Sequence, residues 1–324
     1  ATITSALDTE STQVQTVVPY YRRFLARFPS VQTLAEARTD QVLKSWENLG
    51  YYSRARHLHA AAKEVVACWG GKLPQTRRGL LSLPGIGEYT AAAVLSIAFG
   101  EPVAAVDGNV LRVISRLFAL RGPAGSSESR QKVRDLADQL LSKKEPGLFN
   151  QAMMDLGATV CTPRDPSCPS CPLKDLCMAE NLGLQEKIPA PMKRPAPLHK
   201  HMTAAVLVDG KKRVLMVQRP ASGLLAGLWK FPGGERQAKE ALESALARTV
   251  REELGVSVRV LKAVASVKHA YTHFRVTFHV YRCALEQARP KAIEKHRWRW
   301  VSEKELRRLT LSKAERKILA VLQS

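Results

Sequence analysis

The sequence predicts a protein of two domains, an all-α half followed by an α+β half. The chain has 324 residues, which suits two domains better than one. Apolar residues recur at helical spacing through most of 12–160, without long alternating runs. A segment with four prolines, 184–200, then precedes a region where strand-like and helical runs mix. We therefore expect one domain over 1–183, a linker over 184–200 and a second domain over 201–324.

The individual elements follow from the same patterns. In the first half, helical spacing predicts helices within 40–67, 90–99, 109–120 and 130–142. In the second half we expect a strand, a turn at Asp209-Gly210 and a second strand over 203–218. An amphipathic helix over 238–254, strands within 257–284 and a closing helix over 311–323 complete the second domain.

Charge and cysteine usage restrict the partner and the compartment. A formal net charge of +21 and a pI of about 10.0 favour an anionic partner such as nucleic acid, although a solvated basic surface also fits. We expect neither a membrane span nor a secretory signal, because no long apolar run is present. Four of six cysteines lie within 161–177, a metal-binding pattern of a reducing compartment. The other two, Cys68 and Cys283, are expected to be buried.

Gly85 and Gly87 lie between two helical segments, in the sequence Leu-Pro-Gly-Ile-Gly. Such a turn, with the helix N-terminus that follows it, can hold a phosphate on backbone N–H groups. Twenty residues further on, Asp107 precedes another helical segment and is well placed as its N-cap. From these residues alone, an ordinary helix–helix turn and an ordinary cap remain open.

Residues 83–110 resemble the helix-hairpin-helix glycosylase superfamily. The resemblance implies that the hairpin holds the DNA backbone and that Asp107 stabilises positive charge on the sugar while the base leaves. Relatives such as endonuclease III have a lysine two residues after the second glycine, which forms a Schiff base and cuts the strand. Tyr89 stands there in this chain and cannot do so. We expect Tyr89 and Asn109 to support Asp107.

The cysteine cluster has the spacing C-x6-C-x2-C-x5-C, formed by Cys161, Cys168, Cys171 and Cys177. Four thiolates suit zinc or an iron–sulfur cluster, and spacing alone does not choose between them. With residues 150–158, the segment resembles endonuclease III and the adenine glycosylases, which implies a structural [4Fe–4S] cluster. Arg164 and Lys174 are then candidates for phosphate contact.

Residues 48–56 combine two tyrosines with two arginines. Arginines suit phosphates and an exposed ring can wedge into a base stack, while two core tyrosines beside a solvated charge are the alternative. The resemblance to adenine glycosylases implies that Tyr52 inserts beside 8-oxoguanine and that Arg54 contacts DNA. It also implies a DNA contact for Gln13.

Residues 233–256 resemble the Nudix box, G-x5-E-x7-R-E-U-x-E-E-x-G-U, in which U is a bulky aliphatic residue. The matching residues are Gly234, Glu240, Arg248, Glu252, Glu253 and Gly255. Thr249 replaces one essential glutamate, and working Nudix hydrolases use these carboxylates to hold Mg²⁺ against a pyrophosphate. We therefore expect an inherited fold without nucleotide hydrolysis, like the MutT-like domain of adenine glycosylases.

Residues 269–274 resemble the Phe-Ser-His loop with which adenine glycosylases recognise 8-oxoguanine. Tyr271 and Thr272 replace the phenylalanine and the serine but keep a ring and a hydroxyl, and His273 is retained. Without the resemblance, ordinary strand sequence with a structural histidine explains the segment.

The resemblance to the MutY family extends from about residue 12 to the end and fails before it. The family helix reads S-E-V-M-L-Q-Q-T-Q-V, with a glutamate as general acid and the second glutamine of the pair as a wedge. Aligned on Thr12-Gln13-Val14, these positions hold Ala6 and Ser11, and the segment that usually precedes them is absent. Three readings follow: a weak or inactive member, a foreign segment 1–11, or substitution by Glu10. The last is least favoured, because one helical turn moves a carboxylate by about 5.4 Å.

The favoured function is that of a monofunctional adenine DNA glycosylase of base-excision repair. It would flip adenine out of double-stranded DNA opposite 8-oxoguanine or guanine and hydrolyse the N-glycosidic bond. We expect this activity to be impaired, because Ala6 stands at the position of the general acid. The alternatives are a non-catalytic lesion-binding protein of the same fold, favoured by the missing glutamate, and a Nudix hydrolase, opposed by Thr249. We expect a monomer in the cytoplasm of a bacterium, at the nucleoid.

Overall fold

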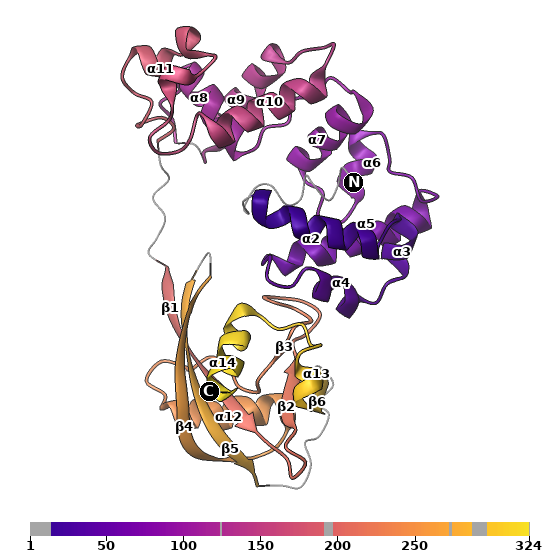
Figure 1. The fold of residues 1–324 in the computed structure, drawn as a ribbon. Helices are drawn as coiled ribbons and strands as arrows, with labels where there is room; N and C mark the ends of the chain where they lie inside the picture. The colour runs from indigo at the N-terminus through magenta and orange to yellow at the C-terminus, as the bar shows by residue number, and fades with distance from the viewer. Residues whose placement is uncertain (1–13, 124, 191–196, 272–273, 287–296, 324) are drawn as a thin grey trace. The chain divides into compact units, whose positions relative to one another are not determined.

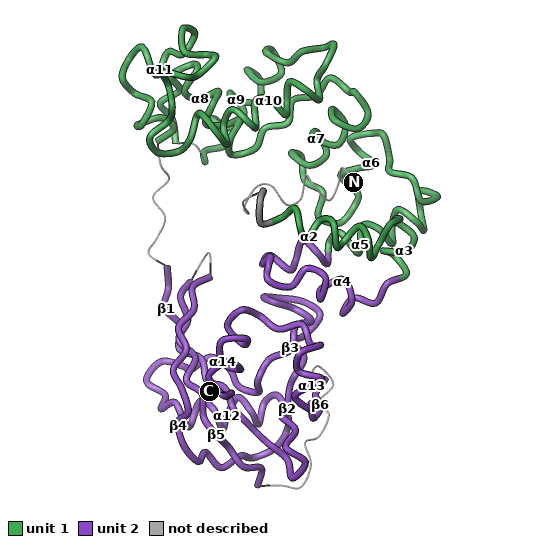
Figure 2. The backbone as a smooth tube through the Cα atoms, in the orientation of Figure 1, with its two compact units in different colours: residues 1–36, 57–194 green, residues 37–56, 195–324 purple. Residues whose placement is uncertain are grey.

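The computed structural model describes residues 14–123, 125–190, 197–271, 274–286 and 297–323 (Figure 1). The chain divides into two compact units (Figure 2). Unit 1 comprises residues 1–36 and 57–194, and unit 2 comprises residues 37–56 and 195–324. The change of unit after residue 194 lies inside the predicted linker. The grouping of 37–56 with the second unit differs from the predicted first domain, 1–183.

The regular elements among the described residues of unit 1 are helices, as predicted, and one isolated bridge joins Pro123 and Ala190. Its central helix is α7, in which every residue from Thr90 to Ser96 is buried. Helix α10 packs on α7 and α8, and Gly157 brings it close to Asn109, since a Cβ at Gly157 would lie 2.6 Å from the Asn109 Cβ. The helices are α2 (Val14–Arg27), α3 (Val31–Glu36), α5 (Tyr52–Cys68), α6 (Arg77–Ser82), α7 (Glu88–Phe99), α8 (Gly108–Leu117), α9 (Ser127–Leu140), α10 (Pro146–Thr159) and α11 (Met178–Asn181), with short 3-10 turns η1 (Cys168–Ser170) and η2 (Lys174–Leu176).

The helical pattern predicted over 40–67 is interrupted in the structure. Helix α4 (Thr39–Ser45) ends before a turn, and α5 begins at Tyr52 within unit 2 and continues into unit 1. The turn contains residues in the left-handed region, with φ of 76° at Asn48 and 83° at Gly50. Glycine and asparagine tolerate that conformation, which ends a right-handed helix.

Within its described residues, unit 2 contains two three-stranded sheets, helix α4, the start of α5 and three further helices. One sheet has the order β1-β5-β4, with β1 (Leu198–Leu207) parallel to β5 (Phe274–Leu285) and β4 (Val258–Ala270) antiparallel to β5. The other has the order β3-β2-β6, formed by Trp229–Lys230, Val214–Gln218 and Arg297–Val301. The three further helices are α12 (Leu242–Leu254), α13 (Glu303–Leu306) and α14 (Lys313–Gln323). The predicted α+β class is confirmed.

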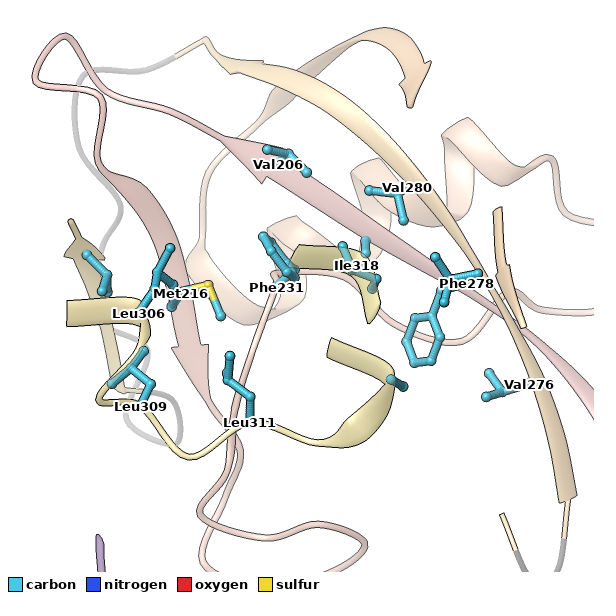
Figure 3. Close-up of a cluster of buried hydrophobic side chains, with 14 residues drawn as sticks. Val206, Met216, Phe231, Val276, Phe278, Val280, Leu306, Leu309, Leu311 and Ile318 are labelled. Atoms are coloured by element: carbon cyan, nitrogen blue, oxygen red, sulfur yellow. The ribbon is translucent and has the colours of Figure 1, made fainter. Parts of the chain in front are cut away.

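Alternation along β1 divides the core of unit 2 into two layers. Ala204 and Val206 join the cluster that contains Phe231, Met216 and Ile318 of α14 (Figure 3). Ala205 and Leu207 point to the opposite face and pack with Leu246 and Val250 of α12. The period of two in a strand produces this arrangement.

The two isolated cysteines differ from each other. Cys283 is buried as predicted, and burial raises the pKa of its thiol to about 12. Cys68 is exposed, so the prediction that it is buried was wrong. It is the last residue of α5, and residues 66–70 at this end of the helix are all exposed. Within the described residues, no helix has the length and apolarity to cross a bilayer.

Candidate functional site

The turn between α6 and α7 forms the predicted hairpin of unit 1. Gly85 has a φ of 78°, and a Cβ there would collide with the His57 side chain, so this position requires glycine. Gly87 is the N-cap of α7, is exposed and has open space around it. The first N–H groups of a helix have no acceptor within it, so a phosphate can approach them at Gly87.

Asp107 is the N-cap of α8, as the sequence predicts. Its Oδ1 accepts a hydrogen bond from the Val110 N–H at 2.7 Å, and its Oδ2 accepts one from the Asn109 Nδ2 at 3.0 Å. Asp107 is 8% exposed. Both carboxylate oxygens are therefore held in place at the N-terminus of α8.

Arg112 extends this contact network and was not identified from the sequence. Its Nη2 donates to the Asn109 Oδ1 at 2.9 Å and to the Gly157 carbonyl at 2.7 Å, and its Nε donates to the Cys161 carbonyl at 2.7 Å. Burial lowers the pKa of the Arg112 guanidinium. Arg112 thus fixes the amide of Asn109, which in turn holds Asp107. The sequence signal that could have indicated this role is that Arg112 lies one helical turn after Gly108, at the start of α8.

The backbone that leads into Asp107 is held by Asn150 of α10. Its Oδ1 accepts from the Ala105 N–H at 3.1 Å, and its Nδ2 donates to the Ser96 Oγ at 2.9 Å and to the Val103 carbonyl at 3.0 Å. Asn150 is 3% exposed, so all three bonds are shielded from water. The sequence singled out residues 150–158 by resemblance only, and the structure gives Asn150 this bracing contact.

Tyr89 lies in the first turn of α7 and is half-buried. Its hydroxyl donates to the Met154 Sδ at 3.1 Å, and its ring packs on Ala92, Ala93 and Ala105. Ala105 precedes Asp107 by two residues. Tyr89 and the segment that carries Asp107 therefore share one packed cluster.

The four clustered cysteines surround one cavity of about 30 Å³ in unit 1, together with Arg116, Lys174 and Glu180. Arg116 Nη1 donates to the Cys161 Sγ at 3.3 Å and to the Thr162 carbonyl at 2.7 Å. Burial, followed by the Glu180 carboxylate, raises the pKa of the Cys168 thiol to about 11. Four thiols around a shared cavity fit a multi-iron cluster, in which each cysteine binds a different iron. Across the described residues, no three His, Cys, Asp or Glu side chains form a group that could hold a single metal ion.

Both basic residues predicted beside the cluster are on the surface. Arg164 is exposed in the loop between Cys161 and Cys168, and Lys174 is exposed at the start of η2. Their roles at phosphate remain predictions.

The aromatic pair at the start of α5 is arranged differently from the expectation. Tyr52 is 5% exposed, and its hydroxyl donates to the Leu311 carbonyl at 3.4 Å within unit 2. Tyr51 is 44% exposed, and the Arg54 guanidinium lies over its ring, 4.9 Å from the centroid. The exposed ring beside Arg54 is therefore Tyr51. A wedge at Tyr52 would require that side chain to leave its buried position.

Of the three residues predicted to read the lesion, the structure describes Tyr271. The Tyr271 ring packs edge-on against His269, with centroids 4.7 Å apart, and lies 4.9 Å from Phe274. Burial raises the pKa of the Tyr271 hydroxyl. Thr272 and His273 lie outside the described residues, as do Ala6, Glu10, Ser11 and Gln13.

The Nudix-like segment keeps its loop and helix, but its carboxylates are engaged. Arg248 binds Glu240 at 2.8 Å and Glu252 at 3.1 Å, and its guanidinium lowers the pKa of Glu240 to about 2. The Thr249 hydroxyl donates to the Ala245 carbonyl at 2.8 Å. The Thr249 hydroxyl is neutral and bonded within α12, so it provides no anionic ligand for a metal ion.

Comparisons with known proteins agree with this division. Residues 5–139 match the family model described as HhH-GPD superfamily base excision DNA repair protein, and residues 203–321 match the model of the NUDIX domain. The human adenine DNA glycosylase is 35% identical over 361 residues, which cover 97% of this chain and 66% of the human protein. The rat adenine DNA glycosylase is 35% identical over 364 residues, which cover 97% of this chain and 70% of the rat protein. A solved thermostable thymine-DNA glycosylase aligns at a TM-score of 0.49 and 32% identity, over 56% of this chain and 82% of that one.

The fold, the hairpin and the sequence matches define the class of protein as a base-excision repair glycosylase of the helix-hairpin-helix type with a Nudix-like domain. Within that class, the chain belongs to the adenine DNA glycosylase family. The predicted family is thereby confirmed.

Proposed function

We propose that this chain removes adenine paired with 8-oxoguanine, or with guanine, from double-stranded DNA by hydrolysing the N-glycosidic bond. The bond between C1′ and the adenine nitrogen breaks, and water adds to C1′ while adenine takes up a proton. The sugar passes through a state with positive charge, which an adjacent carboxylate stabilises. Asp107 supplies that carboxylate.

The observation that carries this proposal is the fixed Asp107 carboxylate. Its two oxygens accept from the Val110 N–H and the Asn109 amide, and Arg112 holds that amide from the other side. A carboxylate held in advance needs little reorganisation when charge develops on the sugar. The test is single-turnover release of free adenine from a duplex with adenine opposite 8-oxoguanine.

The proposed reaction ends at base removal, because the chain lacks the amine that would cut the strand. Tyr89 stands where a Schiff-base lysine is found in lyases of this fold, and a phenol cannot form that adduct. The product is therefore an abasic site in an intact strand.

Recognition of 8-oxoguanine is assigned to Tyr271, Thr272 and His273. His273→Ala is expected to lower the preference for 8-oxoguanine over guanine by about 1–3 kcal/mol, as for other lost base contacts. The measurement is the affinity for two duplexes that differ only in this base. Equal losses of affinity on both duplexes would show that the loop contacts only phosphate.

The cysteine loop is assigned a [4Fe–4S] cluster held by Cys161, Cys168, Cys171 and Cys177. Cys171→Ser is expected to remove the cluster, its iron and its visible absorption, and to weaken duplex binding, because the loop with Arg164 and Lys174 loses its support. Cys68→Ser is the matched control, since Cys68 is exposed on α5 and lies outside the cavity. Elemental analysis that finds zinc and no iron would refute this assignment.

The proposed reaction is expected to be slow, because the position of the general acid holds no acidic side chain. Adenine leaves poorly as an anion, and position 6, which aligns with the family's acid, holds alanine. A placed acid contributes about 10²–10⁴-fold. We therefore assign to the chain as it stands tight binding of the lesion duplex and slow excision. A chain that binds the lesion duplex and releases no adenine at all would be a lesion-binding protein of the same fold.

A further inference from the structure

A buried lysine lies directly before the Nudix-like loop of unit 2, which comprises residues 231–241 between β3 and α12. Lys230 on β3 is 7% exposed, and its ammonium forms an ion pair with the Glu253 carboxylate and donates to the Gly233 carbonyl. The other Glu253 oxygen accepts from the Gly233 N–H at 3.0 Å. The ammonium therefore joins the loop to α12, the helix that carries Glu253.

A second buried carboxylate belongs to the same charge cluster. Glu315 of α14 is 1% exposed, accepts from the Phe231 N–H at 3.3 Å and lies 3.7 Å from the Arg219 guanidinium. Burial raises the pKa of the Glu315 carboxyl. Burial also lowers the pKa of the Lys230 ammonium, although the Glu253 carboxylate opposes this shift. Two cations, Lys230 and Arg219, thus face two carboxylates, Glu253 and Glu315.

The atoms around the Lys230 ammonium are oxygen donors of the kind that hard cations bind. A backbone carbonyl and a carboxylate are typical ligands of Mg²⁺ and Ca²⁺. In hydrolytic Nudix domains, the carboxylates of this box hold Mg²⁺. Here the Lys230 ammonium binds the Glu253 carboxylate and the Gly233 carbonyl, so a single positive charge on a side chain stands beside these oxygens.

The remaining residues of the box do not fit a divalent cation. Thr249 has no carboxylate, and its methyl group lies against Gly234, where an added Cβ would be 2.9 Å from it. Glu252 points outward, with its side chain 59% exposed, and binds Arg248. Of the three box carboxylates, Glu240 and Glu252 bind Arg248, and Lys230 neutralises Glu253.

We propose that the Lys230 ammonium takes the place of the divalent cation of hydrolytic Nudix domains and holds the loop on α12 without metal. The loop is also bonded to β1, through Thr203 N–H to the Gly234 carbonyl at 2.8 Å and Ala205 N–H to the Pro232 carbonyl at 2.7 Å. Unit 2 consequently neither requires Mg²⁺ for its fold nor takes up a magnesium-bound diphosphate at this box. The inference is independent of the excision chemistry of unit 1.

The test compares thermal unfolding with and without divalent cation. Tryptophan fluorescence reports mainly on unit 2, because Trp46, Trp229, Trp298 and Trp300 belong to it and Trp69 alone to unit 1. The full chain is expected to unfold at the same temperature in EDTA and in millimolar Mn²⁺. A higher unfolding temperature in Mn²⁺ would overturn the proposal, because a ligand that binds the folded state stabilises it.

Lys230→Ala is expected to lower the unfolding temperature in EDTA by about 10 °C, because it leaves a buried carboxylate without its partner. The variant leaves two carboxylates facing only Arg219, so Mn²⁺ should restore much of the loss and bind where the full chain binds none. Lys211→Ala, at an exposed turn, is the matched control and should show neither effect. If Lys230→Ala unfolds like the unaltered chain in EDTA, or binds no more Mn²⁺ than it does, the ammonium does not replace a metal. If the variant does not fold, the unaltered chain's response to Mn²⁺ decides.

Discussion

Replacing residues 1–11 with a family-like segment that carries glutamate at position 6 is expected to raise the single-turnover rate of adenine release by about 10²–10⁴-fold. The reason is chemical. Asp107 favours the cationic sugar, but it does not protonate the leaving base, and Ala6 has no proton to give. The substrate is a duplex with adenine opposite 8-oxoguanine, with enzyme in excess so that product release does not affect the rate.

The replaced segment also changes position 11 and the surroundings of the pocket, so its control must separate shape from proton transfer. The same segment with glutamine at position 6 keeps the shape and hydrogen-bonding capacity but supplies no proton. It should bind the duplex as the glutamate version does and excise slowly. Equal rates for the two versions would mean that position 6 is not the acid. Glu10→Gln in the unaltered chain would then be the next variant to measure.

Asp107→Asn, placed in the chain with the glutamate-containing segment, is expected to lower the rate of adenine release by about 10²–10³-fold. Asparagine caps helices as well as aspartate does, so the start of α8 and the bond from the Val110 N–H are retained. What is lost is the negative charge beside the sugar, together with the hydrogen bond from the Asn109 Nδ2, because asparagine has an amino group in place of the second carboxylate oxygen. A purely structural role for Asp107 would therefore leave the rate nearly unchanged.

Two readouts distinguish these roles. The unfolding temperature and the affinity for the lesion duplex should stay close to those of the parent, while the single-turnover rate falls. Asp155→Asn on α10 is the matched control, because Asp155 is an exposed acid of the same unit. A comparable fall in rate for Asp155→Asn would assign the effect to net charge on the DNA-binding unit instead of to the sugar.

Much of the fold could be predicted because it depends on local signals. The apolar stripe of α12, the turn at Asp209 and the run of Val, Phe and Tyr along β5 are each present within about a dozen residues. The cap at Asp107 follows in the same way, since an aspartate before a helical segment has few other local uses. Short strands such as β3 and β6 carry no such pattern and were not predicted.

The packing of residues 37–56 could not be predicted, because its contacts are between residues distant in the sequence. Glu47 accepts from the Arg316 guanidinium at 2.5 Å, and Lys44 donates to the Leu309 carbonyl at 3.2 Å. Each pair is separated by more than 260 residues. Once this segment packs in unit 2, Tyr52 turns inward against Leu311 and Tyr51 remains outside, which no local pattern indicates.

The supporting contacts of the candidate site were also beyond the sequence. Arg112 and Asn150 hold Asn109 and the approach to Asp107 through backbone carbonyls and N–H groups, which are present at every residue and carry no signature. Lys230 is a comparable case. A lysine in a short strand suggests an exposed edge, and only the fold brings its ammonium to Glu253.

We propose that this member of the adenine DNA glycosylase family acts on adenine paired with 8-oxoguanine. The most direct measurement uses the chain with the glutamate-containing segment and two duplexes, one with adenine opposite 8-oxoguanine and one with adenine opposite thymine. Free adenine and strand breaks are both followed. We expect adenine release from the 8-oxoguanine duplex, far slower release from the thymine duplex and no strand cleavage in either. Equal release from both duplexes, or no release from either, would contradict it.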